Sequence, residues 1–267
     1  MKSNPWLLGG IAALFGIGSA LVKDFERAAA RDILSKVSGP EAFVKLQISY
    51  PGLLSPAIGE IGTAKIIAGN FHCDGLPLYT EPKRSQRGTI RSLQLELTNF
   101  KLRDLQCRSF TATIPDCRFD FALARSKRQV RLSKSGTGTG AVEIMASDLP
   151  AFILKKYREI KSVKVTIDEG RVKVAGRGEF LVLTADFEIS ARLAANGTQI
   201  LLKDAVVRLD GKPADPESEQ ALLNAMNPIL DFDRDLDLYD SVQATSVEVL
   251  SDRMRVEGKV KVATKPD

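Results

Sequence analysis

The sequence predicts an α+β fold in which antiparallel strands dominate and a few helices pack against them, behind an N-terminal apolar segment. Three observations support this fold class. Hydrophobic and polar residues alternate along several stretches, two short segments repeat apolar residues every three or four positions, and an uncharged run lies near the N-terminus. Hydrophobic residues make up 44% of the 267 residues and charged residues 27%. This balance is typical of a globular protein with a real core and excludes wholesale disorder.

The N-terminal apolar segment runs from Trp6 to Val22 and contains 17 residues without a charge. This length lies at the lower limit for a membrane span and exceeds the apolar core of most signal peptides. Gly18-Ser19-Ala20 supplies small residues of the kind that a signal peptidase cuts after. The sequence therefore leaves a cleaved signal peptide and a retained membrane anchor open for residues 1–22, and a buried core helix is the third interpretation. The first two place the rest of the chain outside the cytoplasmic membrane.

Helical and strand periods alternate along the rest of the chain. Apolar residues recur at spacings of three and four over residues 22–37 and predict an amphipathic helix, which Ser38-Gly39-Pro40 ends. After Pro40 the hydrophobic period changes to two, as in strands with one buried face. Strands are expected over residues 44–48, 64–71, 90–102, 110–119 and 130–133, and the turns Asp168-Glu169-Gly170 and Asn196-Gly197 predict two later hairpins.

Two short helices are expected to interrupt the strands. Ser147 is the expected cap of the first helix. The second begins with Asp215 as its N-cap and Pro216 at the first helical position, and Pro228 ends or kinks it. Because no low-complexity linker divides the chain, residues 23–267 are expected to form a single domain.

Positive charge is concentrated in one part of the sequence. Between Glu81 and Lys134 there are 13 Lys or Arg against 5 Asp or Glu, a local charge of +8 in a chain whose net charge is +5. Such a block suits an anionic surface, either lipid headgroups or nucleic acid. A solvated strand face whose alternate residues are basic produces the same pattern. The sequence leaves both interpretations open.

The three cysteines, Cys73, Cys107 and Cys117, match no zinc-ligand spacing. In an oxidising compartment, one disulfide and one free thiol are expected, and Cys107–Cys117 is one of the three pairings. The single histidine, His72, adjoins Cys73 in an alternating run, so their side chains are expected on opposite faces of a strand rather than together as a catalytic pair.

No other pattern indicates catalysis, a cofactor or a metal. Gly136-Thr-Gly-Thr-Gly140 lacks the lysine of a phosphate-binding loop and is interpreted as a flexible loop. Asp231, Asp233, Asp235 and Asp237 alternate as they would along an extended chain, but the glycine and glutamate of a calcium loop are missing. A solvated acidic edge is expected there. We therefore expect a protein without enzymatic activity and without a cofactor.

The order of several segments resembles a known family. These segments are VKLQISYPGLLSPAIGEI after the first helix, then SDLPAFI, VKVTIDEGRVKVAGR, LDGKP, NPILDF and TSVEVLSDRMRVEGKVKV. Together, from about Val37 to Val262, they resemble the LmeA-like family of bacterial cell-envelope phospholipid-binding proteins. The basic loop from Lys83 to Arg87 and the three cysteines are not features associated with that family.

The resemblance implies a periplasmic or other envelope location and phospholipid binding without catalysis. It also implies an elongated, strongly curved antiparallel sheet around helices, similar to tubular lipid-binding (TULIP-like) folds. Acyl chains would enter an apolar groove between sheet and helices, because each buried methylene contributes about 0.8 kcal/mol, and basic residues at its mouth would pair with phosphate. The residues expected to line the groove are Phe152, Ile153, Leu181, Leu183, Phe187, Leu222 and Met226.

The expected partners are thus phospholipid and a membrane surface, and not nucleic acid. Two alternatives remain at this stage. An envelope scaffold with a dry core that binds another protein would have nearly the same sequence, and the volume of an internal cavity distinguishes it from a lipid-binding protein. A nucleic-acid-binding protein would use the basic block and show steep salt dependence, but the N-terminal apolar segment argues against it.

Overall fold

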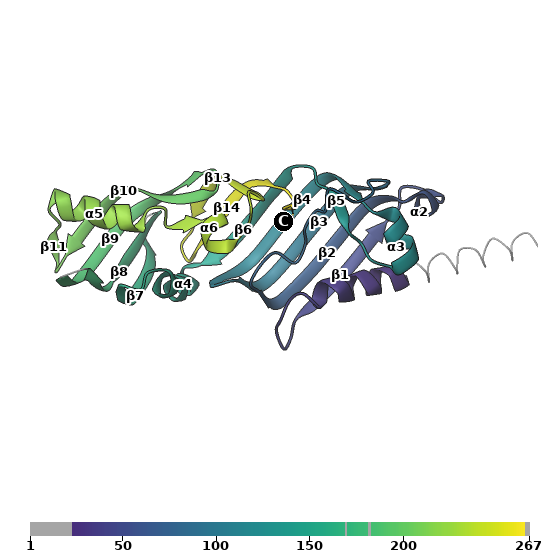
Figure 1. Ribbon diagram of the computed structural model, residues 1–267. Helices are drawn as coiled ribbons and strands as arrows, with labels where there is room; N and C mark the ends of the chain where they lie inside the picture. Colours follow the sequence, from purple (N-terminus) through teal and green to yellow (C-terminus); the bar gives the residue numbers. More distant parts are fainter. Residues whose placement is uncertain (1–22, 169, 181–182, 265–267) are drawn as a thin grey trace, which may run out of the picture.

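The protein is built from two curved sheets placed end to end, as the computed structural model shows for residues 23–168, 170–180 and 183–264 (Figure 1). The chain begins this part with a helix over residues 23–34, called here the N-terminal helix. The elements that follow it in the first half are β1 (Phe43–Ser49), α2 (Ser55–Ile58), β2 (Glu60–Cys73), β3 (Gly88–Leu102), β4 (Leu105–Phe119), α3 (Phe121–Lys127), β5 (Leu132–Lys134), β6 (Gly138–Met145) and the 3-10 turn η1 (Ala146–Asp148). The remaining elements are α4 (Leu149–Lys156), β7 (Ile160–Asp168), β8 (Arg171–Phe180), β9 (Leu183–Asn196), β10 (Gln199–Leu209), β11 (Lys212–Pro213), α5 (Pro216–Met226), β12 (Leu230–Asp231), α6 (Phe232–Leu236), β13 (Val242–Val249) and β14 (Arg253–Val260).

The larger sheet has the strand order β1-β2-β3-β4-β6-β14-β13, with β5 beside β4, and the smaller sheet has the order β11-β10-β9-β8-β7, with β12 beside β10. They meet where the backbone N–H of Ala244 on β13 donates to the carbonyl of Gly197, 2.7 Å away. One group of buried hydrophobic residues continues from the first sheet into the second. The strand-dominated α+β fold with a strongly curved sheet is therefore confirmed.

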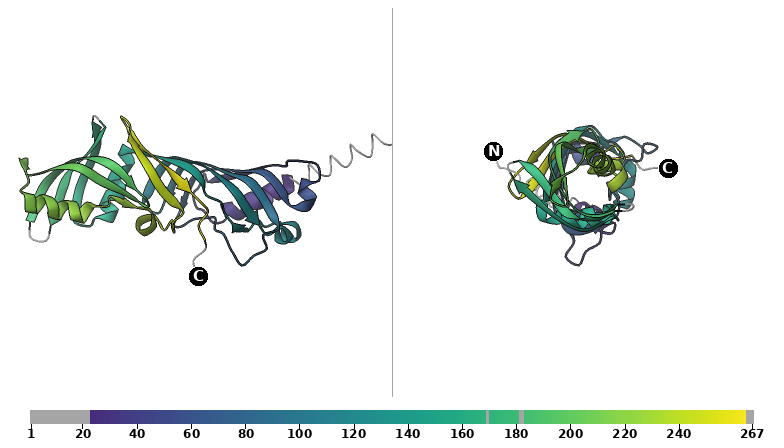
Figure 2. Two further views of the ribbon diagram at one scale, coloured as in Figure 1. Left: turned by 90° about the horizontal axis from the view of Figure 1, so that it is seen from above. Right: turned by 90° about the vertical axis from the view of Figure 1, so that its left-hand side faces the viewer.

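The larger sheet is a half-barrel, and two asparagines change which side chains of β2 and β3 face its inside. On β2 the inward-facing positions shift by one residue at Asn70, between Ala68 and Phe71, and Asn99 marks the same shift on β3. Both asparagines have positive φ, 55° and 46°, a conformation that asparagine tolerates better than most residues. The Asn99 side-chain amide donates to the Asn70 side-chain oxygen at 2.8 Å. The register of β2 with β3 is the same before and after these residues, and the end view shows the strands curving around a ring (Figure 2).

The pairing of β2 with β3 is parallel, whereas the other strand pairs of the described chain are antiparallel. The chain must therefore return along the sheet between these strands, and residues 74–87 make the return. We call this connection the strap. The Thr80 N–H donates to the carbonyl of Ala263 at 2.8 Å, and the Glu81 N–H donates to that of Leu132 at 2.7 Å. These bonds hold the strap across the open side of the half-barrel.

The N-terminal helix packs within the curve of the larger sheet (Figure 2). Ala29 is buried and Phe25 and Ile33 are partly buried, which agrees with the predicted apolar face. The Glu26 carboxylate accepts from the backbone N–H of Ile48 at 2.7 Å. Asp32 receives two bonds from the Arg131 guanidinium, at 2.6 and 3.1 Å. The helix ends at residue 34 rather than 37, and Val22 lies outside the described residues.

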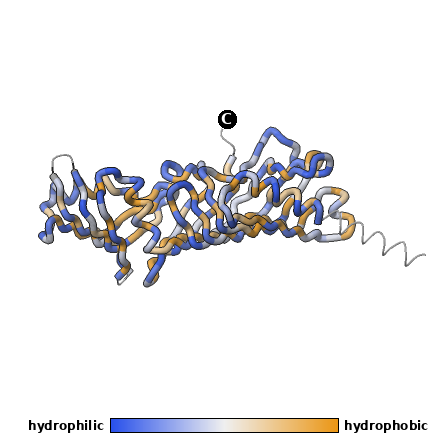
Figure 3. The backbone as a smooth tube through the Cα atoms, turned by 90° about the horizontal axis from the view of Figure 1, so that it is seen from below, coloured by the Kyte–Doolittle hydropathy of each residue, from blue (hydrophilic) through white to orange (hydrophobic). Residues whose placement is uncertain are grey.

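The predicted strands and hairpins are present, with β2 and β4 longer than expected. Hydrophobic and hydrophilic residues alternate along the strands of both sheets (Figure 3). At α5, the Asp215 side chain caps the helix by accepting from the N–H groups of Glu217 and Ser218, as predicted. The Ser147 cap was wrong: Ser147 lies within the 3-10 turn, and no side chain caps α4.

The interpretation of residues 136–140 as a flexible loop was wrong, because Gly138 and Gly140 lie within β6. A Cβ atom at Gly138 would lie 1.8 Å from the Thr113 carbonyl oxygen and 2.7 Å from the Ile114 Cα atom. The glycines therefore allow β6 to approach the backbone of β4 closely, a common role of glycine inside a strand.

We expect Gly138→Ala to lower the free energy of unfolding by at least about 2 kcal/mol, because β6 must move away from β4 to accommodate the methyl group. Urea denaturation measures this change. Thr139→Ala, at the exposed neighbouring position, is the control and should change stability by less than about 0.5 kcal/mol. Equal effects of the two substitutions would show that close backbone approach does not constrain residue 138.

The Asp32–Arg131 pair predicts a pH dependence. Hydrogen bonding from Arg131 holds the pKa of Asp32 below its ordinary value. Since the unfolded chain then binds more protons in acid, the stabilisation is complete above pH about 4 and is lost as the pH falls through the lower folded-state pKa.

We expect Asp32→Asn to lower the free energy of unfolding by about 1–2 kcal/mol at pH 7. The difference from the wild type should shrink below pH about 4. Chemical denaturation across this pH range measures it, with Asp24→Asn as the control because Asp24 pairs with Arg27 at the surface, 3.6 Å away. A constant difference between Asp32→Asn and wild type down to pH about 2 would contradict this assignment.

Candidate functional site

Three apolar cavities lie in a row inside the molecule. The largest, called here the central cavity, has a volume of about 180 Å³, and its two neighbours have volumes of about 50 and 40 Å³. Ile33, Ile66 and Leu78 line both the central cavity and the neighbour beside the N-terminal helix. Leu105 and Ile144 line both the central cavity and the neighbour in the second half. These side chains therefore lie between neighbouring apolar cavities of the interior.

The walls of the central cavity come from the concave face of the larger sheet. Five adjacent strands, β1 to β4 and β6, contribute Val44, Ile66, Ala68, Leu95, Leu97, Phe110, Ile114, Val142 and Ile144. Because neighbouring strands lie about 4.8 Å apart, these five strands form an arc about 19 Å wide. Phe71 and Phe100, which stack with ring centroids 5.3 Å apart, also line the cavity. Such a space exceeds a water molecule by about an order of magnitude, and its apolar walls offer water few partners.

The strap and the chain after β14 cover the cavity. Leu76, Pro77 and Leu78 of the strap line it, as do Val262 and Ala263. The hydrogen bonds at Thr80 join these two segments directly. The half-barrel alone would be an open trough, and the crossing strap covers part of its concave side.

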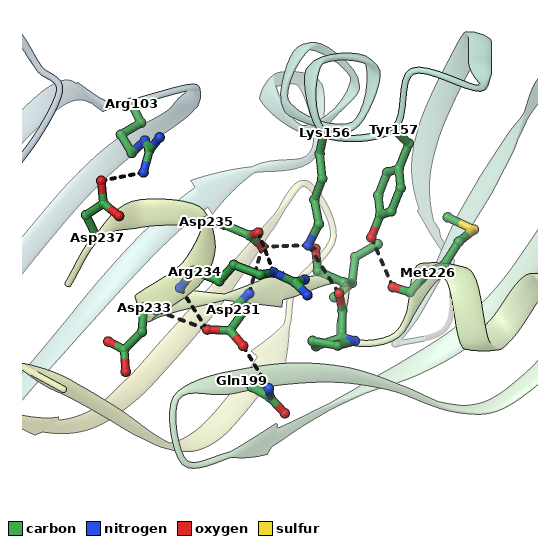
Figure 4. Close-up of polar contacts among 12 residues, drawn as sticks. Arg103, Lys156, Tyr157, Gln199, Met226, Asp231, Asp233, Arg234, Asp235 and Asp237 are labelled. Carbon is green, nitrogen blue, oxygen red and sulfur yellow. Dashed lines mark hydrogen bonds and ion pairs between the residues drawn. The ribbon is translucent and has the colours of Figure 1, made fainter. Parts of the chain in front are cut away.

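Helix α6 covers the cavity at the junction of the two halves. Its buried residues Phe232 and Leu236, together with Leu238, line the cavity. Asp237 accepts from Arg103 at 2.5 Å, which ties the end of α6 to the turn between β3 and β4 (Figure 4). Asp235 forms an ion pair with Lys156 of α4, also at 2.5 Å, and both side chains are nearly buried. Charged groups outside the cavity thus hold its apolar cover in place.

The ammonium group of Lys156 has a protein partner for each of its hydrogen-bond donors. Its Nζ donates to Asp235 Oδ2 and to the carbonyls of Ile229 and Pro228, at 2.5, 3.0 and 3.2 Å (Figure 4). An ammonium group has three donors, so none is left for a phosphate. Burial lowers the pKa of Lys156, although Asp235 acts in the opposite direction. Lys156 therefore joins α4 to α6 and is not a headgroup ligand in this arrangement.

The prediction of a solvated acidic edge at residues 231–237 was wrong. Asp231 caps α6 by accepting from the N–H groups of Asp233 and Arg234. Burial alone would raise the pKa of Asp231, but these bonds and one from Gln199 hold it below its ordinary value. The segment is a helix rather than an extended chain, because its caps and ion pairs satisfy the carboxylates. Within the described ranges, no group of three or more His, Cys, Asp or Glu side chains forms a possible metal site.

All three cysteines are free and buried, so the expected disulfide is absent. Cys107 and Cys117 lie on the same strand, β4, and cannot pair across neighbouring strands. Cys73 and Cys107 line the central cavity, and burial raises the pKa of these thiols to about 11 and about 12. His72 points away from the cavity toward Asp74, at 3.0 Å, so His72 and Cys73 lie on opposite faces of β2 as predicted.

The predicted groove residues lie in the second half of the molecule. Phe152 and Ile153 on α4 line the 40 Å³ cavity there. Phe187, Leu222 and Met226 are buried in the core of the second half, and none of these five residues lines the central cavity. Leu181 lies outside the described residues, as does the side chain of Leu183 at the start of β9. Lipid contact by these residues stays a prediction.

Neither the open depression on the surface nor the basic block of residues 81–134 forms an apolar site comparable to the central cavity. A depression of about 640 Å³ lies on the outer face of the larger sheet, but it is open and only about half apolar, and Arg255 there is paired with Glu143 and Glu257. In the basic block, Arg91 pairs with Glu60, Arg103 with Asp237 and Arg131 with Asp32. Between residues 23 and 264, apart from 169 and 181–182, no helix is long and apolar enough to cross a membrane.

Comparison with known proteins agrees with this geometry. The model of the LmeA-like phospholipid-binding family matches residues 86–259, which extend from just before β3 almost to the end of β14. No curated protein and no solved structure matches the chain at a significant level. The family match covers more than half of the chain and confirms the resemblance found in the sequence. This chain belongs to the LmeA-like phospholipid-binding family.

Proposed function

We propose that the protein binds a phospholipid in the bacterial cell envelope, without catalysis, and holds an acyl chain in the central cavity. One observation carries the proposal: a member of a phospholipid-binding family has an apolar cavity of about 180 Å³ inside its curved sheet. A scaffold with a dry, filled core would lack such a space. The 17 uncharged residues before the N-terminal helix support an envelope location, as a signal peptide or as an anchor.

The energetics favour an acyl chain as the guest. Each methylene transferred from water to the cavity contributes about 0.8 kcal/mol. The guest also contacts side chains that otherwise face empty space, such as Leu97 and Val142. A narrow, flexible chain suits a cavity that is separated from its neighbour by side chains such as Leu105 and Ile144.

The headgroup has a natural place at one edge of the cavity. Apart from the two thiols, Ser241 and Lys261 are the polar residues in its lining. The ammonium of Lys261 is partly exposed and pairs with Asp240 at 2.8 Å. We propose that the phosphate lies near Lys261, where the headgroup remains in water while the acyl chain extends inward.

Native mass spectrometry of protein purified from a bacterial host tests this proposal. The wild type should carry phospholipid, or take it up from vesicles after delipidation. Ala68→Phe should reduce the bound fraction by about tenfold or more, because the ring occupies the space between β2 and the strap. Ala175→Phe adds the same side chain at an exposed position on β8 and should bind like the wild type.

Circular dichroism should show that both variants fold. Two results would contradict the proposal: a delipidated wild type that takes up no phospholipid, or a folded Ala68→Phe variant that binds as much as the control.

A further inference from the structure

The end of the molecule formed by α2, α3 and the turn before α2 carries an unusual apolar surface. Leu53 and Leu54 are 81% and 77% exposed, and Ile58 is 58% exposed. These three are the most exposed large hydrophobic side chains of the described residues, and they lie within six positions of one another. Scattered single apolar residues need no explanation, but a cluster at a tip indicates a surface that contacts something apolar.

Basic side chains lie beside this apolar tip. Gly59, directly after α2, lies against the Phe121 ring at the start of α3, so the two helices are neighbours (Figure 1). Helix α3 ends in the exposed residues Arg125, Lys127 and Arg128, which form no ion pair within the described chain. Apolar residues surrounded by unpaired positive charge are typical of surfaces that bind anionic lipid.

The nearby carboxylates are already occupied. Glu60 pairs with Arg91 at 3.8 Å, Asp24 pairs with Arg27 at 3.6 Å, and Glu26 accepts from the Ile48 backbone. Asp120 caps α3 by accepting from the N–H of Leu123. The charge that this end presents to a partner is therefore positive.

The described part of the chain also begins at this end. The first turn of the N-terminal helix lies beside the last residues of β1, through the bond from Ile48 to Glu26, and Leu53 follows β1 by four residues. The uncharged run that ends at Val22 directly precedes this helix in the sequence. The first described residues therefore lie at the same end as the apolar tip.

We propose that this end, through Leu53, Leu54 and Ile58 with the basic end of α3, docks on a bilayer that contains anionic phospholipid. This inference rests on the proposed function, because docking would bring the central cavity to the membrane that supplies its lipid. The cavity of about 50 Å³ that adjoins the central cavity is lined by Ile61, just after α2, so the row of cavities extends toward this end.

Fluorescence of the labelled full-length protein tests the docking surface. Leu54→Cys carries a polarity-sensitive dye, and Val206→Cys, a 55% exposed position on β10, is the matched control. The native thiols are buried and react slowly, so the label is selective. Vesicles contain phosphatidylcholine alone or an equal mixture with phosphatidylglycerol, with or without bromine in the acyl chains.

The dye at position 54 should shift to the blue and be quenched by brominated lipid in the mixed vesicles, whereas the dye at position 206 should not respond. Reversing charge with Lys127→Glu and Arg128→Glu should weaken the response at position 54 by about tenfold or more. Equal responses at positions 54 and 206, or no dependence on phosphatidylglycerol, would overturn the docking surface. A blue shift without vesicles that grows with protein concentration would assign the tip to self-association instead.

A second measurement separates this inference from the proposed function. Leu53→Ser with Leu54→Ser should leave the phospholipid that co-purifies with the protein unchanged, because neither residue lines the central cavity. The same variant should slow lipid uptake from mixed vesicles by about tenfold or more. If the variant retains lipid and takes it up as fast as the wild type, the docking surface is refuted and the proposed function stands. If no form of the protein carries lipid, the proposed function is refuted.

Discussion

The parallel pairing of β2 and β3 is the constraint on which the cavity depends. Fourteen residues in β2 span about 46 Å. The connection of residues 74–87 must cover most of that distance again before β3 begins, and a chain of this length has little slack. It therefore crosses the concave face, where Thr80 and Glu81 fix it to the segments at Ala263 and Leu132. A hairpin at the same place would leave the curved sheet open to water.

The curvature of the larger sheet and the crossing of the strap together leave a space that side chains do not fill. The larger sheet curves away from a flat packing surface, and the paired asparagines Asn70 and Asn99 lie on its adjacent strands β2 and β3. The N-terminal helix, α6 and the strap then meet its concave face at separate places, so their apolar side chains cannot interdigitate throughout. An empty apolar space of this size costs stability on the order of a few kcal/mol. A bound acyl chain restores contacts there, which links the stability of the fold to its proposed ligand.

The sequence predicted the elements better than their arrangement. Period-two runs located β1, β3 and β4, and the Asp215-Pro216 cap located the start of α5, because these signals are local. The parallel crossover left no local signal beyond the length of its connection. The aspartates at alternate positions of residues 231–237 matched the pattern of an extended, exposed strand. The ion-pair partners Lys156 and Arg103, which favour the observed helix, are distant in sequence. Lipid contact by the predicted groove residues of the second half stays a prediction, because a residue that lines a cavity, such as Leu97, has the same local pattern as a core residue.

The cavity proposed to hold the acyl chain lies in the first half of the molecule, while the second half has a smaller cavity and is joined to the first through α4 and α6. Crystallography with a phospholipid brominated on its acyl chains tests the central claim most directly. The account predicts anomalous bromine density between Ala68 or Val142 and the strap at Leu76–Leu78. Bromine density that lies only on the outer surface, or a saturated complex whose central cavity stays empty, would contradict it.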